Sequence, residues 1–96
     1  MKLAVISFFD KQLQRYTSPG YDDHSDPEVI KELVRTNIVK SEPMKRKIYE
    51  AKNLVLMGYF DTETGKHEVH DPEFLLNCDE VISNVQDYER NERKDN

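Results

Sequence analysis

Two short apolar runs, residues 3–9 and 54–60, dominate the hydrophobic pattern of the chain. Both runs are rich in β-branched and aromatic side chains and are apolar at consecutive positions, which is typical of a strand buried on both faces. Each run is followed by a polar turn and by a segment that can return as a second strand, over residues 14–17 and 66–70. The pattern therefore predicts two β-hairpins whose apolar strands lie at the centre of one sheet.

The first predicted turn follows Asp10 and is polar. Beyond it we expect Leu13 and Tyr16 to face the core, because the returning segment should share the apolar face of the strand before it. Pro19 and Gly20 then interrupt regular structure.

The second predicted turn runs from Asp61 to Gly65. Gly65 suits a left-handed backbone position that closes a hairpin loop, and the Asp61 carboxylate can accept hydrogen bonds from amides within the loop. We expect the returning segment to be an edge strand.

The main helix is predicted to begin after Ser25 or Asp26, because either side chain can cap the first-turn amides and Pro27 fits the first helical position. Its apolar stripe consists of Val29, Ile30, Leu33, Val34 and Ile38. Pro43 ends the helix or bends it. The pattern over residues 44–53 is weak and favours a helical turn or an ordered loop.

A second helix start is predicted at Asp71, Pro72 and Glu73, since these residues repeat the arrangement of aspartate before proline. Residues 74–76 would begin a short helix, and Val81, Ile82 and Val85 continue an apolar stripe at helical spacing. The tail, residues 89–96, has no apolar residue and is predicted to be disordered.

These elements together predict an α+β fold in one domain, residues 1–88. A small antiparallel sheet built from two β-hairpins would carry one main helix packed on it and a short C-terminal helix. The chain has 96 residues, of which 36% are hydrophobic, so its core must be small. Self-association would add buried area, and we therefore expect a homodimer.

The single cysteine, Cys78, cannot form an intrachain disulfide, which favours a reducing compartment. No apolar run approaches the roughly 20 residues that a membrane span needs, and the first residues lack a cleavage signal. We expect a soluble intracellular protein without membrane contact.

Candidate catalytic and metal-binding residues are few. His67 and His70 could suggest a metal site, but on a strand they point to opposite faces and would not share an ion. Cys78 is better explained as a structural thiol than as a nucleophile, because the sequence identifies no base for it. We predict no catalytic residue, no metal and no cofactor, and hence not an enzyme.

The net charge is −5, which argues against a general nucleic-acid coat. A local basic cluster nevertheless consists of Lys40, Lys45, Arg46, Lys47 and Lys52, with Tyr49 among them. Together with the strand aromatics Phe8, Phe9, Tyr59 and Phe60, it offers cations for phosphates and rings for bases, as a single-strand platform requires. The alternative is that the rings belong to the core and the cations form a solvated face.

The stretch from Leu56 to Asp61, with Thr64 and Gly65, resembles the small non-structural protein of gokushoviruses, which are single-stranded-DNA phages of the Microviridae. The further matching positions are Val5-Ile6-Ser7, Phe9-Asp10-Lys11, Tyr16, Pro19, Val34 and Pro72-Glu73-Phe74-Leu75, and the shared turn and structural positions are Asp10, Pro19, Gly58, Asp61, Gly65 and Pro72. The resemblance implies a non-capsid protein in the cytoplasm of the infected bacterial host, serving DNA replication or the switch toward single-strand production and genome packaging. This chain departs from the family at residues 43–47, where a basic segment replaces an acidic one.

Two classes of function remain open. The first is a replication accessory that contacts single-stranded DNA through the basic cluster. The second is a non-enzymatic adaptor, expected to be homodimeric, that binds a phage or host replication protein.

Overall fold

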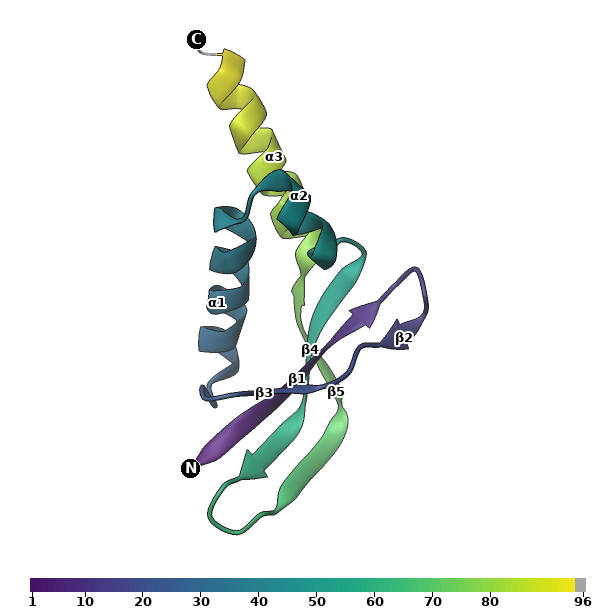
Figure 1. Ribbon diagram of the computed structural model, residues 1–96, viewed down its shortest axis with the longest axis vertical. Coiled ribbons are helices and arrows are strands. Elements are labelled where there is room, and N and C mark those ends of the chain that lie inside the picture. Colours follow the sequence, from purple (N-terminus) through teal and green to yellow (C-terminus); the bar gives the residue numbers. More distant parts are fainter. Residues whose placement is uncertain (95–96) are drawn as a thin grey trace.

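A computed structural model describes the backbone of residues 1–94 and the side chains of residues 1–92. The elements are, in chain order, β1 (Lys2–Asp10), β2 (Arg15–Tyr16), β3 (Gly20–Asp22), α1 (Pro27–Lys40), α2 (Pro43–Arg46), the 3-10 turn η1 (Lys47–Tyr49), β4 (Lys52–Asp61), β5 (His67–Asn77) and α3 (Cys78–Lys94). Figure 1 shows an elongated molecule in which the strands cross in the lower half and the helices occupy the left and upper parts. The predicted α+β fold is confirmed.

The strands form one antiparallel sheet in the order β2-β1-β4-β5, and β3 pairs with β1 on the same side as β2. The long apolar strands β1 and β4 therefore lie at the centre, and β5 is an edge strand, as predicted. Both predicted hairpins are present, because β1 pairs with β2 and β4 pairs with β5.

Both predicted turns are held by their aspartates. Oδ1 of Asp10 accepts hydrogen bonds from the backbone amides of Gln12 (2.9 Å) and Leu13 (3.1 Å). Oδ1 of Asp61 accepts one from the amide of Glu63 (2.9 Å), and Gly65 has a φ of 73°, the left-handed conformation expected of it.

Gly58 lies where the register of β4 and β5 shifts, between Leu56 and Gly58. Its φ is 152°, and a Cβ atom built at this position would lie 1.9 Å from the carbonyl oxygen of Glu68. Only glycine permits this close approach of the two strand backbones.

Asp26 caps α1, since its Oδ1 accepts a hydrogen bond from the amide of Glu28 (3.0 Å) and Pro27 occupies the first helical position. The helix ends at Lys40, before Pro43, and Pro43 begins the short helix α2. The weakly patterned segment after it is helical in α2 and η1, in agreement with one of the two expectations.

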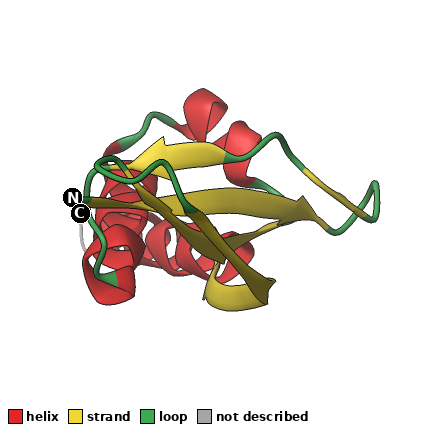
Figure 2. Cartoon of the chain, turned by 90° about the horizontal axis from the view of Figure 1, so that it is seen from below, coloured by secondary structure: helices red, strands yellow, loops and turns green. Residues whose placement is uncertain are grey.

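The predicted inward orientation of Leu13 and Tyr16 is wrong, because both side chains are exposed. The strand β2 has only two residues, and the β1–β2 turn projects from the body at the right of Figures 1 and 2, beyond the cover of any helix drawn there.

The predicted helix start at residues 71–76 is also wrong. These residues continue β5, with Phe74 opposite Val55 and Leu76 opposite Leu54. Pairing along β4 outweighs the local signal, and Pro72 is tolerated because β5 is an edge strand. The C-terminal helix begins instead at Cys78.

The C-terminal helix is long rather than short, since α3 has 17 residues and runs to Lys94. The tail predicted to be disordered is therefore helical over residues 89–94, and residues 95–96 lie outside the described residues. A contact across the fold accounts for this: Glu89 of α3 pairs with Arg46 of α2.

Candidate binding surfaces

The central strands β1 and β4 present two different faces. Alternation along the paired strands places Ala4, Ile6, Phe8, Leu54, Leu56 and Tyr59 on one face. All six belong to the main core cluster or pack against it, together with buried side chains of α1 and α3. We call this the covered face; Figure 2 shows the long helices lying together beside the strands.

On the opposite face, which we call the open face, no side chain of α1 or α3 in the main core cluster packs within the described part of the chain, although Ser7 is only 2% exposed and donates its hydroxyl to the Thr17 carbonyl (2.8 Å). It consists of Leu3, Val5, Ser7 and Phe9 of β1, Tyr16 of β2, Tyr21 of β3, Asn53, Val55 and Phe60 of β4, and His67, Val69, Phe74 and Asn77 of β5. None of these residues is Asp, Glu, Lys or Arg. Val55 is only 5% exposed, yet it lies outside the main core cluster. An antiparallel sheet that faces water on one side normally carries polar residues there.

Aromatic rings connect the strands on the open face. The ring centroids of Tyr21 and Phe60 are 5.6 Å apart, and those of Phe60 and His67 are 4.6 Å apart. Tyr21 Oη lies 3.1 Å from His67 Nε2. A second pair, Phe9 and Tyr16, has centroids 4.9 Å apart at the other end of β1. The open face therefore carries aromatic groups towards both ends and no Asp, Glu, Lys or Arg between them.

A second apolar surface lies between the two long helices. A groove of about 230 Å³ is lined by Arg35 and Val39 of α1 and by Val81, Asn84, Val85 and Tyr88 of α3. Tyr88 is 67% exposed, and Val39 is also exposed. We call this the helical groove. It lies on the helical layer, whereas the open face belongs to the sheet.

The basic cluster does not act as one surface. Arg46 has a side chain only 7% exposed, and its Nη2 lies 2.6 Å from Oε1 of Glu89. Its Nε also donates a hydrogen bond to the carbonyl oxygen of Ser41 (3.0 Å). Lys52 lies 3.9 Å from a carboxylate oxygen of Asp10. Arg46 and Lys52 therefore neutralise acidic partners within the fold.

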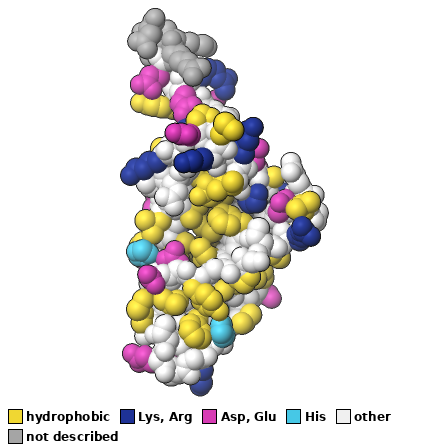
Figure 3. Space-filling model, viewed as in Figure 1, with side chains coloured by type: hydrophobic (Ala, Val, Ile, Leu, Met, Phe, Trp, Pro, Cys, Tyr) yellow, Lys and Arg dark blue, Asp and Glu magenta, His cyan; other side chains and the backbone are white. Residues whose placement is uncertain are grey.

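Tyr49 packs against the core, where its ring makes an edge contact with Phe8 at 6.0 Å. Its side chain is half-buried there, which leaves only part of it free to contact a base. The remaining cations, Lys40, Lys45 and Lys47, are exposed. Figure 3 shows Lys and Arg gathered in the upper part of that view, whereas hydrophobic side chains fill much of its middle and lower parts.

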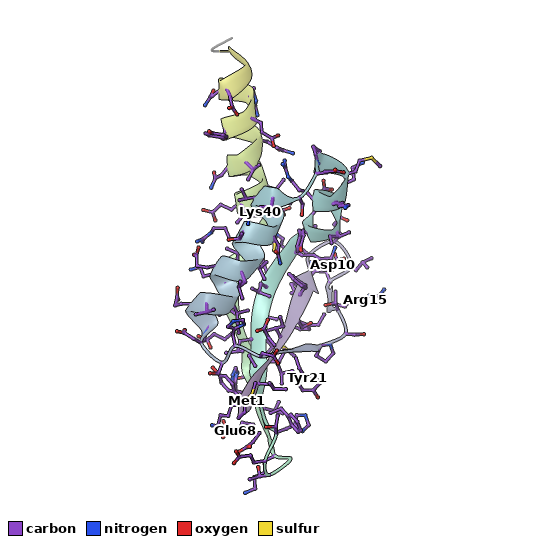
Figure 4. The ribbon with its side chains drawn as sticks, turned by 60° about the vertical axis from the view of Figure 1, so that its left-hand side comes forward. Met1, Asp10, Arg15, Tyr21, Lys40 and Glu68 are labelled. Atoms are coloured by element: carbon purple, nitrogen blue, oxygen red, sulfur yellow. The ribbon has the colours of Figure 1, made fainter. Side chains whose placement is uncertain are left out.

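The strand aromatics do not join the exposed lysines. Phe8 and Tyr59 pack on the covered face, and Phe60 lies on the open face. Figure 4 shows the separation directly, because Lys40 lies high on the helical part and Tyr21 lies low among the strands. The combination of cations and rings that the sequence suggested is not assembled in one place.

The two histidines lie on opposite faces of β5, as predicted. His67 contacts Phe60, and His70 lies beside Tyr59, the next residue along β4. Among the residues whose side chains are described, no group of three His, Cys, Asp or Glu could hold a metal ion.

Cys78 is fully buried at the start of α3. Burial, together with the neighbouring Asp79 carboxylate, raises the pKa of its thiol to about 11. A thiol in this state is a poor nucleophile at neutral pH, so the geometry agrees with a structural role.

Asp79 joins α3 to the segment before β4. Its Oδ1 accepts a hydrogen bond from the amide of Ala51 (2.8 Å), and its Oδ2 lies 3.0 Å from Nζ of Lys11. Partial desolvation raises the pKa of Asp79, but the Ala51 amide and Lys11 outweigh it, so the pKa is lowered overall. Ala51 itself has a left-handed φ of 60°.

The fold and its surfaces define a small α+β domain with an apolar open face and a separate apolar helical groove. Comparisons of the chain with protein-family profiles, curated proteins and solved structures found no match. None of the helices within residues 1–94 has the length and apolar character that a membrane crossing requires.

Proposed function

We propose that this protein is a non-enzymatic adaptor that binds another protein through the helical groove. The observation that carries the proposal is that exposed Val39 and Tyr88 and half-buried Val85 line one groove between α1 and α3, with few polar groups beside them. Apolar grooves between helices commonly receive the apolar side of an amphipathic helix. The partner we propose is such a helix, presented by a phage or host replication protein.

The process that this adaptor would serve follows from the resemblance to the gokushovirus non-structural protein. We propose replication of single-stranded phage DNA, or the switch toward genome packaging, in the cytoplasm of the infected bacterium. Buried Cys78, with its raised pKa, is not a nucleophile on which this role depends.

The test compares proteins captured from extracts of phage-infected bacteria by the wild type, by Val85→Asp and by Gln86→Ala. Val85 lines the groove, whereas Gln86 is an exposed neighbour on α3 outside the groove lining. We expect one replication protein to be retained by the wild type and by Gln86→Ala and lost with Val85→Asp. Titration of that purified protein should then show at least a tenfold weaker affinity for Val85→Asp, about 1.4 kcal/mol. The proposal fails when no captured protein depends on Val85.

A second candidate function is contact with single-stranded DNA. The observation in its favour is that Lys40, Lys45 and Lys47 remain exposed near the junction of α1 and α2. Three phosphate contacts would give a shallow salt dependence, with a slope of about −2 in log K against log salt concentration.

Fluorescence anisotropy of a labelled oligonucleotide at low salt tests this second candidate. We expect the double charge reversal Lys45→Glu and Lys47→Glu to abolish binding, while Lys66→Glu in the β4–β5 turn leaves it unchanged. Wild-type protein that fails to bind at tens of micromolar excludes this function.

A further inference from the structure

The open face differs from the rest of the surface in its lack of charge. The chain carries 33 Asp, Glu, Lys and Arg side chains, 19 of them acidic and 14 basic, in 96 residues. None of them lies on the open face as defined above, although that face runs across all five strands. Exposed members include Tyr21, at 59%, and Val69, at 82%. Ser7 and Val55, in the middle of the face, are only 2% and 5% exposed, so the exposed apolar members form two regions, one with Tyr21 and Val69 and one with Tyr16. Exposed apolar patches of this kind mark interaction surfaces.

The isolated chain also exposes more surface than its mass predicts. Its accessible surface is 6727 Å². A compact monomer of 11.4 kDa should expose about 5,800 Å². Its radius of gyration is 15.4 Å, compared with about 12.5 Å for a compact chain of this length. The excess of roughly 900 Å² follows from the elongated shape, whose extents are 57 × 28 × 18 Å, and it leaves room for an interface that buries ~800 Å² per partner.

A nucleic acid does not fit the open face, because the face offers no cation to neutralise phosphates. A partner recognised by charge does not fit it either. A second copy of this chain does fit. Each copy has a net charge of −5, so two copies repel through their acidic surfaces, and the uncharged open face is where they can meet without like-charge contacts. In a two-fold dimer the same patch serves both partners, and an uncharged apolar patch is complementary to itself.

We propose that two copies of this chain pair through their open faces, sheet against sheet. The rings of Tyr21, Phe60 and His67 form one contact region, and Phe9 with Tyr16 forms the other. Two sheets packed face to face lie about 10 Å apart, which lets side chains of this size interdigitate. The dimer would bury the apolar face that the helices of each chain leave uncovered.

The dimer leaves the helical groove of each copy free, because the groove lies on the helical layer. If the protein is the adaptor proposed above, the dimer would offer two equivalent grooves. It would then bind a partner with several binding helices more tightly than one copy does. The pairing itself does not depend on that function, because it rests on the open face alone.

The test is sedimentation equilibrium of the full chain over a range of concentrations, with Tyr21→Glu as the variant and Tyr88→Glu as the matched control. Both tyrosines are exposed, but Tyr21 lies on the open face and Tyr88 in the helical groove. We expect wild type and Tyr88→Glu to form dimers, and the dissociation constant of Tyr21→Glu to rise at least tenfold, because a carboxylate would be buried without a partner.

Val69→Glu is the second variant. Replacing Tyr21 also removes its contact with His67 within the chain, whereas Val69 is more exposed than Tyr21. Circular dichroism establishes that each variant is folded, and Val69→Glu decides the matter if Tyr21→Glu does not fold. A wild type that stays monomeric at about 100 µM overturns the proposal, since a standard-size interface is normally populated there. The proposal is also overturned if Tyr88→Glu disrupts the dimer while Tyr21→Glu and Val69→Glu leave it intact. Failure here leaves the Val85-dependent capture intact, so the two proposals fail separately.

Discussion

The covered and open faces of the sheet are made by alternate residues of the same strands, and both are apolar. On the covered face Leu54 and Leu56 are fully buried, because α1 and α3 pack there. On the open face Leu3 and Phe60 are only partly buried, although Val55 is 5% exposed. The polar contacts that attach the helices, Arg46 with Glu89 and Asp79 with Ala51, also belong to the helical side. The chain thus stabilises one face by itself, and the other is where we propose that a second copy binds.

The largest expected effect is the difference in the free energy of unfolding lost when a leucine is shortened on the covered face and on the open face. Leu56→Ala should lower the free energy of unfolding by about 3 kcal/mol, since it removes buried methyl groups and leaves a cavity. Leu3→Ala, the same substitution on the open face, should cost about 1 kcal/mol or less in the monomer. Urea unfolding at protein concentrations low enough to keep the chain monomeric measures both values. Equal losses would show that the open face is packed within a single chain.

The next effect concerns the attachment of α3 to α2. Glu89→Ala should cost about 2 kcal/mol, because it leaves the buried guanidinium of Arg46 without its carboxylate. The cost stays moderate because Arg46 keeps the carbonyl of Ser41 and the Glu89 side chain is 42% exposed.

The matched control is Asp87→Ala, which removes an ion pair with Arg90 on the exposed surface of the same helix. It should cost less than about 0.5 kcal/mol. Thermal unfolding followed by circular dichroism compares the two variants. A Glu89→Ala protein as stable as Asp87→Ala would mean that the last turns of α3 do not hold the helical layer.

Features that depend on a few neighbouring residues could be predicted from the sequence. The Asp61–Gly65 turn and the start of α1 at Asp26 and Pro27 are examples, because their hydrogen bonds join residues within about one turn. The failures involve distant partners. Residues 71–76 contain a helix-start signal, but pairing with β4 makes them a strand, and Glu89 is ordered by Arg46, 43 positions away.

The basic cluster shows the same difference between local features, which the sequence predicts, and contacts with distant partners, which it does not. Lys45, Arg46 and Lys47 are adjacent in the sequence and look equivalent, but Arg46 alone turns inward to Glu89. The open face did have a signal, since β1 and β4 are apolar at alternate as well as consecutive positions. That pattern indicates two buried faces, but it does not say whether the second is covered by the same chain or by another.

A pH-dependent effect is expected from Asp79, which joins the helical layer to β1 and to the start of β4. Because the folded pKa is lowered from its ordinary value of 3.8, ionised Asp79 stabilises the fold fully above that value. The contribution is lost as the pH falls through the folded pKa. Asp79→Asn should therefore be less stable than wild type at pH 7, and the difference should shrink below pH 4, the region of the carboxyl titration.

Urea unfolding at a series of pH values measures this difference. Lys11→Met is the matched control, because it removes the ion pair and keeps the hydrogen bond from the Ala51 amide. It should show a weaker version of the same pH dependence. A difference between Asp79→Asn and wild type that stays constant down to pH 3 would contradict the assigned role of the carboxylate.

The smallest expected effect is the relief of backbone strain, which we compare at two positions, Ala51 and Gln14. Ala51 and Gln14 have left-handed φ values of 60° and 54°, which cost a non-glycine residue energy. Ala51→Gly and Gln14→Gly should each raise the free energy of unfolding by about 0.5 kcal/mol, because the relieved strain slightly exceeds the entropy that glycine adds to the unfolded chain.

Ala51 is held by Asp79 through its amide and by the Lys11 amide through its carbonyl, whereas Gln14 lies in the projecting β1–β2 turn. In the Asp79→Asn background the gain from Ala51→Gly should therefore fall, since the chain can relax without its clamp, while the gain from Gln14→Gly should not change. A double-mutant cycle by urea unfolding measures both couplings, and equal couplings for the two sites would show that Asp79 does not impose the strain at Ala51.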